Sequence, residues 1–223
     1  MSGGLPGQRL RGGQGRGGRA GGLAGQDERD RACDDVRAGC RRGGGVEAEA
    51  SSIATYQLGV VPGLLQTPEY AAASARAGLV LPKDVNRVVD ARVRRQHILD
   101  QETPPRLWTI IDEGALVRPA HASGPEVMQG QLQRLVAMTE RPNIVVQVLP
   151  FSAGLHAGTG GPFVLLDFPD PSDRPIVHLE TRHDGLCLED SEQVTDYRDV
   201  LDHFQGAALS PAESVHHLTR LID

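Results

Sequence analysis

Residues 143–168, NIVVQVLPFSAGLHAGTGGPFVLLDF, form the clearest strand, loop, strand unit of the sequence. Both ends of this stretch are rich in Val, Ile, Leu and Phe, which is typical of buried strands. The segment between them holds four glycines, one His and one Thr. Its Gly-Thr-Gly-Gly run leads into a strand and has no following Lys-Ser or Lys-Thr, so it is not a phosphate-binding loop. We predict a wide, hairpin-like connection within a sheet, whose glycines serve the shape of the backbone.

The patterns around this unit predict further helices and strands. Helical apolar spacing and capping signals predict helices over residues 46–57, 67–77, 84–101 and 191–204, a helix that begins at Pro125, and a last helix over residues 210–221. Short apolar runs predict strands over residues 107–111, 143–149, 162–168, 176–180 and 186–188. The strand, helix, strand order around Pro125 implies a parallel pair with a right-handed crossover. The predicted fold class is therefore α/β (α+β), a small mixed β-sheet covered by helices.

Residues 1–45 differ in composition from everything that follows. They contain 15 of the 27 glycines, and nine Arg against five Asp or Glu. Because apolar residues are sparse and show no period, this segment cannot bury enough surface to offset its ordering entropy, and we predict a disordered Gly/Arg-rich tail. Residues 46–223 are predicted to form a single domain. The tail is either a basic arm for nucleic acid or, as we prefer, a solvated tail or a misassigned translation start.

The charge balance and the cysteines limit the class of protein. The net charge is −6, and the basic tail means that the remaining chain is more acidic still. An acidic surface is poorly suited to nucleic acid, which is bound by clustered Lys and Arg. The sequence shows no secretory signal and no apolar run of membrane-spanning length. Together with an odd number of cysteines, three, this predicts a soluble cytoplasmic protein with free thiols and no membrane partner.

Several short strings, taken in order, are similar to one protein family. They are VEAEASSIATYQLGVVPGLLQTPEYA, RVRRQHIL, IIDEGALVRP, MQGQLQRL, NIVVQVLPFSAGLHAG, FVLLDF and ALSPAESVHHL. In this order and spacing they resemble the uncharacterised C-terminal domain of bacterial XRE-type helix-turn-helix transcriptional regulators, which are often encoded beside a small partner protein in antitoxin-like pairs. The resemblance covers about residues 46–223, and VPGLLQTPEYA is its most specific part.

The resemblance implies a domain that binds a small-molecule effector or a small protein partner. In this family a separate N-terminal helix-turn-helix reads the DNA, and residues 1–45 show no such pattern. DNA is therefore an expected partner only if a missing helix-turn-helix is restored, and DNA contact through the Gly/Arg tail is a further hypothesis. A homodimer is a further hypothesis. No cofactor is expected.

Arg92, Arg95 and Gln96 are the polar residues that match the family strings best. Arginines three positions apart share one face of a helix, and a guanidinium binds a carboxylate or a phosphate by two parallel hydrogen bonds. In the alternative interpretation, which we prefer, the two arginines pair inside the fold with Glu113 or Glu180, or they face solvent.

A candidate pocket is expected where residues 61–70, 92–96 and 150–156 meet. Its predicted ligand-binding residues are Tyr70, Arg92, Arg95, Gln96, Pro150, Phe151 and His156. The His lies in the glycine-rich loop, where it is either a proton-transfer group or, more commonly, a packing and hydrogen-bonding residue.

An enzyme that reuses this fold is the alternative function. Glu113 ends a predicted strand, and ligands tend to lie at strand ends in open sheets. In this hypothesis Glu113 and His156 are the catalytic acid-base residues. Arg92 and Arg95 are the other working groups, and the substrate is a small metabolite. The sequence has no Gly-x-Ser-x-Gly elbow, and we favour a non-enzymatic domain.

A metal site is the remaining chemical hypothesis. His178, Glu180, His183 and Asp184 place four potential ligands within seven residues. The spacing alone does not bring the two histidines together, and no Cys pair accompanies them. We therefore predict no metal site.

Overall fold

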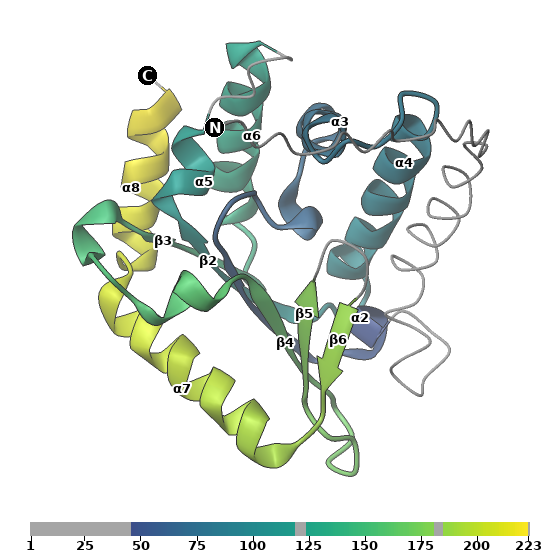
Figure 1. Ribbon diagram of the computed structural model, residues 1–223, viewed down its shortest axis with the longest axis vertical. Helices are drawn as coiled ribbons and strands as arrows, with labels where there is room; N and C mark the ends of the chain where they lie inside the picture. Colours follow the sequence, from purple (N-terminus) through teal and green to yellow (C-terminus); the bar gives the residue numbers. More distant parts are fainter. Residues whose placement is uncertain (1–45, 119–123, 181–184, 223) are drawn as a thin grey trace, which may run out of the picture.

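The computed structural model describes residues 46–118, 124–180 and 185–222, and a mixed six-stranded sheet runs through them (Figure 1). The strand order is β3-β2-β1-β4-β5-β6. The strands are β1 (Ser52–Gln57), β2 (Arg106–Asp112), β3 (Ile144–Leu149), β4 (Phe163–Asp167), β5 (Ile176–Glu180) and β6 (Gly185–Leu188). Strands β1, β2 and β3 are parallel, whereas β4, β5 and β6 pair antiparallel. The predicted fold class, a small mixed sheet covered by helices, is confirmed.

Helices cover both faces of the sheet. The α-helices are α2 (Val46–Glu49), α3 (Pro68–Ala77), α4 (Val85–Gln96), α5 (Glu113–Val117), α6 (Pro125–Met138), α7 (Ser191–Ala207) and α8 (Pro211–Ile222). Short 3-10 helices are η1 (Gly63–Leu65), η2 (His97–Asp100), η3 (Phe151–Ala153) and η4 (Ala157–Gly160). Helices α3, α4, α6 and α8 lie on one face, and α7 runs along the other (Figure 1). Within the described ranges every helix is too short or too polar to cross a lipid bilayer.

Two apolar layers result, because successive side chains of a strand point to opposite faces. On the face of α3, α4, α6 and α8, the buried residues include Ile53, Leu107, Val146, Leu135 and Leu218. On the face of α7 they include Tyr56, Ile110, Phe163, Leu165 and Phe204. The central strands are therefore apolar on both sides, as is typical of strands buried between helices.

The helix-capping signals of the sequence are confirmed where they were strongest. Thr67 is the N-cap of α3 and accepts a hydrogen bond from Tyr70 N at 3.1 Å. Ser210 and Glu213 form a reciprocal capping box at the start of α8, in which the Glu213 carboxylate accepts from Ser210 N at 2.9 Å. The Ser210 hydroxyl, which donates to the same carboxylate at 2.6 Å, and then Ser210 N lower the pKa of Glu213. Such local hydrogen bonds favour a helix start at these positions.

Two predicted helices are wrong in extent. Residues 46–57 contain only the four-residue α2 and then the strand β1, because Ile53 and Tyr56 are buried on opposite faces of the sheet. The helix predicted over residues 84–101 ends at Gln96 and continues as the 3-10 helix η2. Asp84 occupies its N-cap position without a side-chain capping bond.

The hairpin-like connection predicted between β3 and β4 is also wrong. These strands are separated in the sheet by β2 and β1. Strand β4 instead pairs with β1, with Phe163 opposite Tyr56. The segment between β3 and β4, here called the 150–162 loop, therefore crosses the carboxyl ends of β2 and β1. This crossing brings the glycine-rich loop over the end of the sheet where the parallel strands terminate.

Cys187 on β6 is disulfide-bonded, which corrects the expectation of a free thiol at this position. The tail predicted to be disordered, residues 1–45, lies outside the described residues.

Candidate functional site

Two buried glutamines hold the segment of residues 61–67, here called the 61–67 loop. Gln66, 2% exposed, donates to Val61 O at 2.7 Å. Gln131 of α6 is fully buried; it donates to Leu65 O at 2.8 Å and accepts from Thr67 N at 2.7 Å. Because buried backbone groups need hydrogen-bond partners, these two amides fix the most specific of the family strings against the core.

Helix α4 contacts the same loop through two predicted ligand-binding residues. Arg92 Nη1 donates to Gln66 Oε1 at 3.0 Å. Gln96 Nε2 donates to the carbonyls of Gly63 and Gln66, each at 2.9 Å. Both side chains thus bind backbone or amide groups of the loop.

Tyr70 closes the network from α3. Its Oη accepts a hydrogen bond from Val61 N at 3.3 Å, and its side chain is 7% exposed. Burial raises the pKa of Tyr70, while the hydrogen bond from Val61 and the charge of Arg92 act in the opposite direction. That Tyr70, Arg92 and Gln96 also bind a ligand stays a prediction.

Arg95 makes an ion pair with α2. Its Nε lies 2.7 Å from Glu47 Oε2, and its Nη2 donates to Glu47 Oε1 at 3.2 Å. The guanidinium is about half exposed, so the pair stabilises the fold by about 1 kcal/mol or less. The arginine therefore pairs inside the fold, but with Glu47 and not with Glu113 or Glu180, because it lies in the last turn of α4 beside α2.

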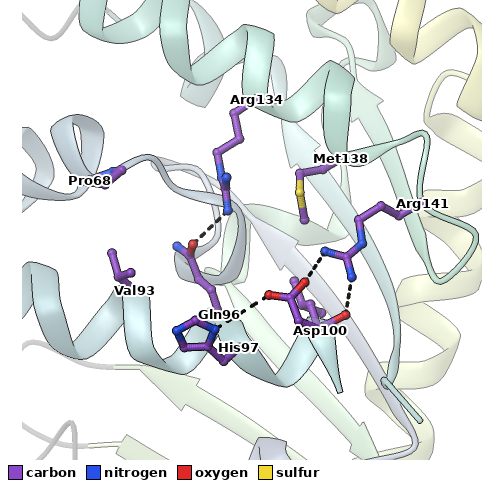
Figure 2. Close-up of a pocket in the computed structure, with 9 residues that line it drawn as sticks. Pro68, Val93, Gln96, His97, Asp100, Arg134, Met138 and Arg141 are labelled. Atoms are coloured by element: carbon purple, nitrogen blue, oxygen red, sulfur yellow. Dashed lines mark hydrogen bonds and ion pairs between the residues drawn. The ribbon is translucent and has the colours of Figure 1, made fainter. Parts of the chain in front are cut away.

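A cleft of about 260 Å³ opens between α6 and the end of α4 with η2 (Figure 2). Its lining residues are Pro68, Val93, Gln96, His97, Leu99, Asp100, Arg134, Met138 and Arg141. Gln96 belongs both to this cleft and to the network of the 61–67 loop. Its Oε1 accepts from Arg134 Nη2 at 2.9 Å while its Nε2 holds the loop. A molecule bound in the cleft could thus contact a side chain, Gln96, that also holds the 61–67 loop.

The charged groups of the cleft are unequally compensated. Arg141 Nη1 lies 2.7 Å from Asp100 Oδ1, and His97 Nδ1 lies 3.9 Å from Asp100 Oδ2. Arg134 Nη2 contacts only the neutral Gln96 amide, and Arg134 Nε is buried without a hydrogen-bond partner within the described part of the chain. In Figure 2 the Arg134 side chain extends from α6 toward Gln96 across the cleft.

A second group of polar residues lies at the carboxyl end of β2, under the 150–162 loop. Asp112 Oδ1 caps α5 by accepting from Gly114 N at 2.8 Å, and its Oδ2 is 3.6 Å from His156 Nε2. His156 Nδ1 accepts from Gly158 N at 3.1 Å. An accepting Nδ1 places the ring proton on Nε2, toward Asp112. Both nitrogens of His156 therefore face protein groups.

Aromatic packing secures this loop from below. The ring of Tyr56 stacks on Phe204 with centroids 4.4 Å apart, and His156 packs edge-on against Tyr56 at 6.0 Å. Tyr56 is fully buried, and its Oη has no partner within hydrogen-bonding geometry among the described residues. Burial, and then the carboxylate of Asp112, raise the pKa of Tyr56 well above its usual range. The phenol thus stays neutral.

Glu113 fixes the start of the loop. Its Oε2 accepts from Phe151 N at 2.7 Å, and its Oε1 lies 3.4 Å from His217 Nε2 of α8. Phe151 itself is 63% exposed, and Leu155 is 97% exposed. The loop is therefore anchored at its two acidic contacts while its apolar side chains project outward.

The family model of a domain of unknown function (DUF5753) matches residues 41–220. The chain belongs to this family. No curated protein and no solved structure matches the chain.

In this DUF5753 domain the residues of the predicted pocket lie in two separate groups. Tyr70, with the 61–67 loop, belongs to the apolar layer of α3, α4, α6 and α8. His156 packs instead on Tyr56 and Phe204 of the α7 layer. The four groups named for an enzyme divide in the same way, since Arg92 and Arg95 are held on α4 while Glu113 and His156 are held at the end of β2. Pro150 and Phe151 lie with the second group.

The residues named as metal ligands are partly visible in this DUF5753 domain. His178 is half-buried in β5, and its Nε2 has no hydrogen-bond partner in the part of the chain that the structure describes. Burial lowers the pKa of His178, while the carboxylates of Glu180 and Glu47 act in the opposite direction. The described residues contain no cluster of three or more His, Cys, Asp or Glu that could hold a metal ion. His183 and Asp184 lie outside the described ranges.

Sequence reasoning missed the charged residues of the cleft. Arg134 lies within the string MQGQLQRL, three residues after the buried Gln131, so the two share a helix face toward α4. That spacing was the available signal for Arg134. Asp100 and Arg141 are far apart in the sequence and meet only through the packing of η2 against the end of α6.

Proposed function

We propose that this DUF5753 domain is the sensing domain of a bacterial XRE-type regulator and binds a small-molecule effector in the cleft between α4 and α6. The observation that carries the proposal is which sequence strings contribute the residues that line the cleft. Val93, Gln96 and Leu99 come from the string RVRRQHIL, and Arg134 comes from MQGQLQRL. Two of the strings that resemble the regulators thus line the same concave site.

The walls of the cleft suit a small organic molecule. Ligand sites are concave and largely apolar, with a few polar groups that fix orientation. Here Val93, Leu99 and Met138 supply apolar surface, and Gln96 and Arg134 supply hydrogen-bonding groups. The volume of about 260 Å³ lies just below the range of drug-sized ligands, about 300–1,000 Å³. A metabolite of modest size fits this space.

The same geometry offers a route for signalling. A ligand shifts a conformational equilibrium only if it contacts the two states differently. Gln96 accepts from Arg134 in the cleft and donates to the 61–67 loop. A ligand that draws Arg134 away from Gln96 would weaken the hydrogen bonds between Gln96 and the 61–67 loop. The loop could then move, and its movement would alter the surface that it contacts. In this proposal DNA is read by a helix-turn-helix and not by the acidic domain itself, and the protein acts in the cytoplasm.

Filling the cleft should abolish effector binding. Val93→Trp places an indole on the cleft wall, so compounds that raise the melting temperature of the full chain in a thermal-shift screen of metabolites should lose that effect. Val89→Trp is the matched control, because Val89 lies one turn earlier on α4, is half-buried, and does not line the cleft. A stabilising compound whose effect survives Val93→Trp but not Val89→Trp would place the site elsewhere, and a screen without any stabilising compound would count against an effector.

The second candidate function is the binding of a small protein partner, and the exposed side chains of the 150–162 loop favour it. Phe151 and Leu155 project from a loop that Glu113 and His156 fix in place, and rigid exposed apolar residues are common binding anchors.

The partner hypothesis is tested by co-expression with the small protein that the resemblance places beside this chain in the genome. Phe151→Ser combined with Leu155→Ser should lower the recovery of the co-purified partner by about tenfold. Leu79→Ser removes another strongly exposed leucine at the end of α3, 67% exposed, and should leave recovery unchanged. Equal recovery from both variants would contradict this role of the loop.

A further inference from the structure

The charge balance of the cleft between α4 and α6 leaves Arg134 uncompensated. Arg141 is neutralised by Asp100 at 2.7 Å, and Asp100 Oδ2 also lies 3.9 Å from His97 Nδ1. Arg134 has no carboxylate partner among the described residues and donates only to the Gln96 amide. The cleft therefore carries an excess of positive charge that resides on this guanidinium.

The environment of Arg134 makes this charge unfavourable without a ligand. Its Nε is closed to solvent and has no acceptor within the described ranges, and a buried donor without a partner destabilises a protein. Arginine binds carboxylates side by side through two parallel N–H groups. An anion that enters the cleft and lets the guanidinium turn away from Gln96 would supply the missing acceptors.

From these observations we infer that the cleft binds a small organic carboxylate whose acid group pairs with Arg134. The inference rests on the proposed effector-binding function and specifies its ligand class. The single uncompensated charge of Arg134 matches a monoanion better than a dianion such as phosphate, because Asp100 already pairs with Arg141. The apolar wall formed by Val93, Leu99 and Met138 takes the hydrocarbon part of the same molecule.

Three probes separate charge from shape. Hexanoate has the carboxylate and the apolar chain, hexanamide has the same shape without the charge, and inorganic phosphate has the charge without the chain. Each is titrated into the full chain labelled with ¹⁵N, and the side-chain Nε–H signal of Arg134 is followed by NMR. Hexanoate is expected to shift this signal to lower field in a saturable manner, and hexanamide and phosphate are expected not to do so.

Variants test whether Arg134 is the contact. Arg134→Gln should weaken hexanoate binding about tenfold or more. Arg134→Lys should recover part of the affinity, because lysine restores the positive charge but not the two parallel N–H groups of the guanidinium. Arg94→Gln removes a charge from the exposed side of α4 and should leave the affinity unchanged. Backbone NMR spectra show whether each variant is folded.

The outcomes distinguish the ligand class from the existence of the site. Hexanoate affinity that is the same in the wild type and in folded Arg134→Gln overturns the inference, as does preferential binding of phosphate. If hexanamide binds as tightly as hexanoate and Val93→Trp abolishes both, the inference fails while the effector site stands. If neither hexanoate nor hexanamide binds, the inference is overturned, and the metabolite screen with Val93→Trp decides the effector site separately.

Discussion

Replacing Gly158 with alanine is expected to lower the free energy of unfolding by about 3 kcal/mol, measured by urea denaturation. A Cβ at this position would lie 2.4 Å from Cζ and 2.5 Å from Cε1 of Tyr56. The Tyr56 ring is fully buried and stacked on Phe204, so it has no space into which it could move. The loop must therefore lift, which also draws His156 away from Asp112, whose Oδ2 lies 3.6 Å from His156 Nε2.

Gly160→Ala is the control, because it belongs to the same loop and, apart from the adjacent residues of the chain, no heavy atom of the described residues lies within 4 Å of the place that its new methyl group would take. Its effect should be about 0.5 kcal/mol or less. A second check is the double variant with Tyr56→Leu. Because the shorter side chain removes the clashing ring atoms, Gly158→Ala should cost clearly less in that background. Equal losses with and without the Tyr56 ring would mean that close packing is not the reason for this glycine.

The same glycine shows how far the sequence could predict this loop. The strands on either side were readable from their apolar runs, because a buried strand is recognisable over a few residues. The strand order was not readable, because the pairing of β4 with β1 is decided by contacts between residues more than a hundred positions apart, such as Tyr56 and Phe163. Hence the loop was predicted as a hairpin, although Gly158 in fact allows it to cross above Tyr56.

The first strand was missed for a related reason. The residues around Ile53 and Tyr56 follow Ala- and Glu-rich positions that favour a helix, and a short apolar run does not by itself distinguish a strand from a helix. The insertion of β1 between β2 and β4 settles the matter, because residues 52–56 then have partners on both sides. Tertiary pairing overrides the local preference here.

The polar residues of the candidate site were easier to find than to interpret. Arg92 and Gln96 were identified as important from the family strings, but a helix pattern does not reveal whether their partners are a ligand or a carbonyl of the chain. The partners lie in the 61–67 loop, about thirty residues earlier, as the contacts of Gln96 with Gly63 and Gln66 show. Arg134 was not identified because its importance lies in the lack of a carboxylate partner among the described residues. Only the packing of the helices shows which charged groups lie beside it.

Replacing Gln131 with leucine should be the other strongly destabilising change, with a loss of about 3 kcal/mol in the free energy of unfolding. Leucine has nearly the same volume, but it leaves Leu65 O without its donor and Thr67 N without its acceptor. Gln133→Leu, on the exposed side of the same helix, should change stability by about 0.5 kcal/mol or less. If the two variants unfold at the same urea concentration, the 61–67 loop does not depend on the Gln131 amide.

Gln131→Glu tests the direction of each hydrogen bond. The carboxylate can still accept from Thr67 N, but it cannot donate to Leu65 O, and burial of its charge is unfavourable. Burial raises the pKa of the introduced carboxyl above its value in the unfolded chain. Protonation is then favoured by folding, so the deficit in stability relative to the wild type should be largest at neutral pH and should shrink as the pH falls, since the protonated carboxyl regains a donor. A deficit that is independent of pH would show that the position is open to solvent, and the loop would then have to be held by its other contacts, those of Gln66, Gln96, Arg92 and Tyr70.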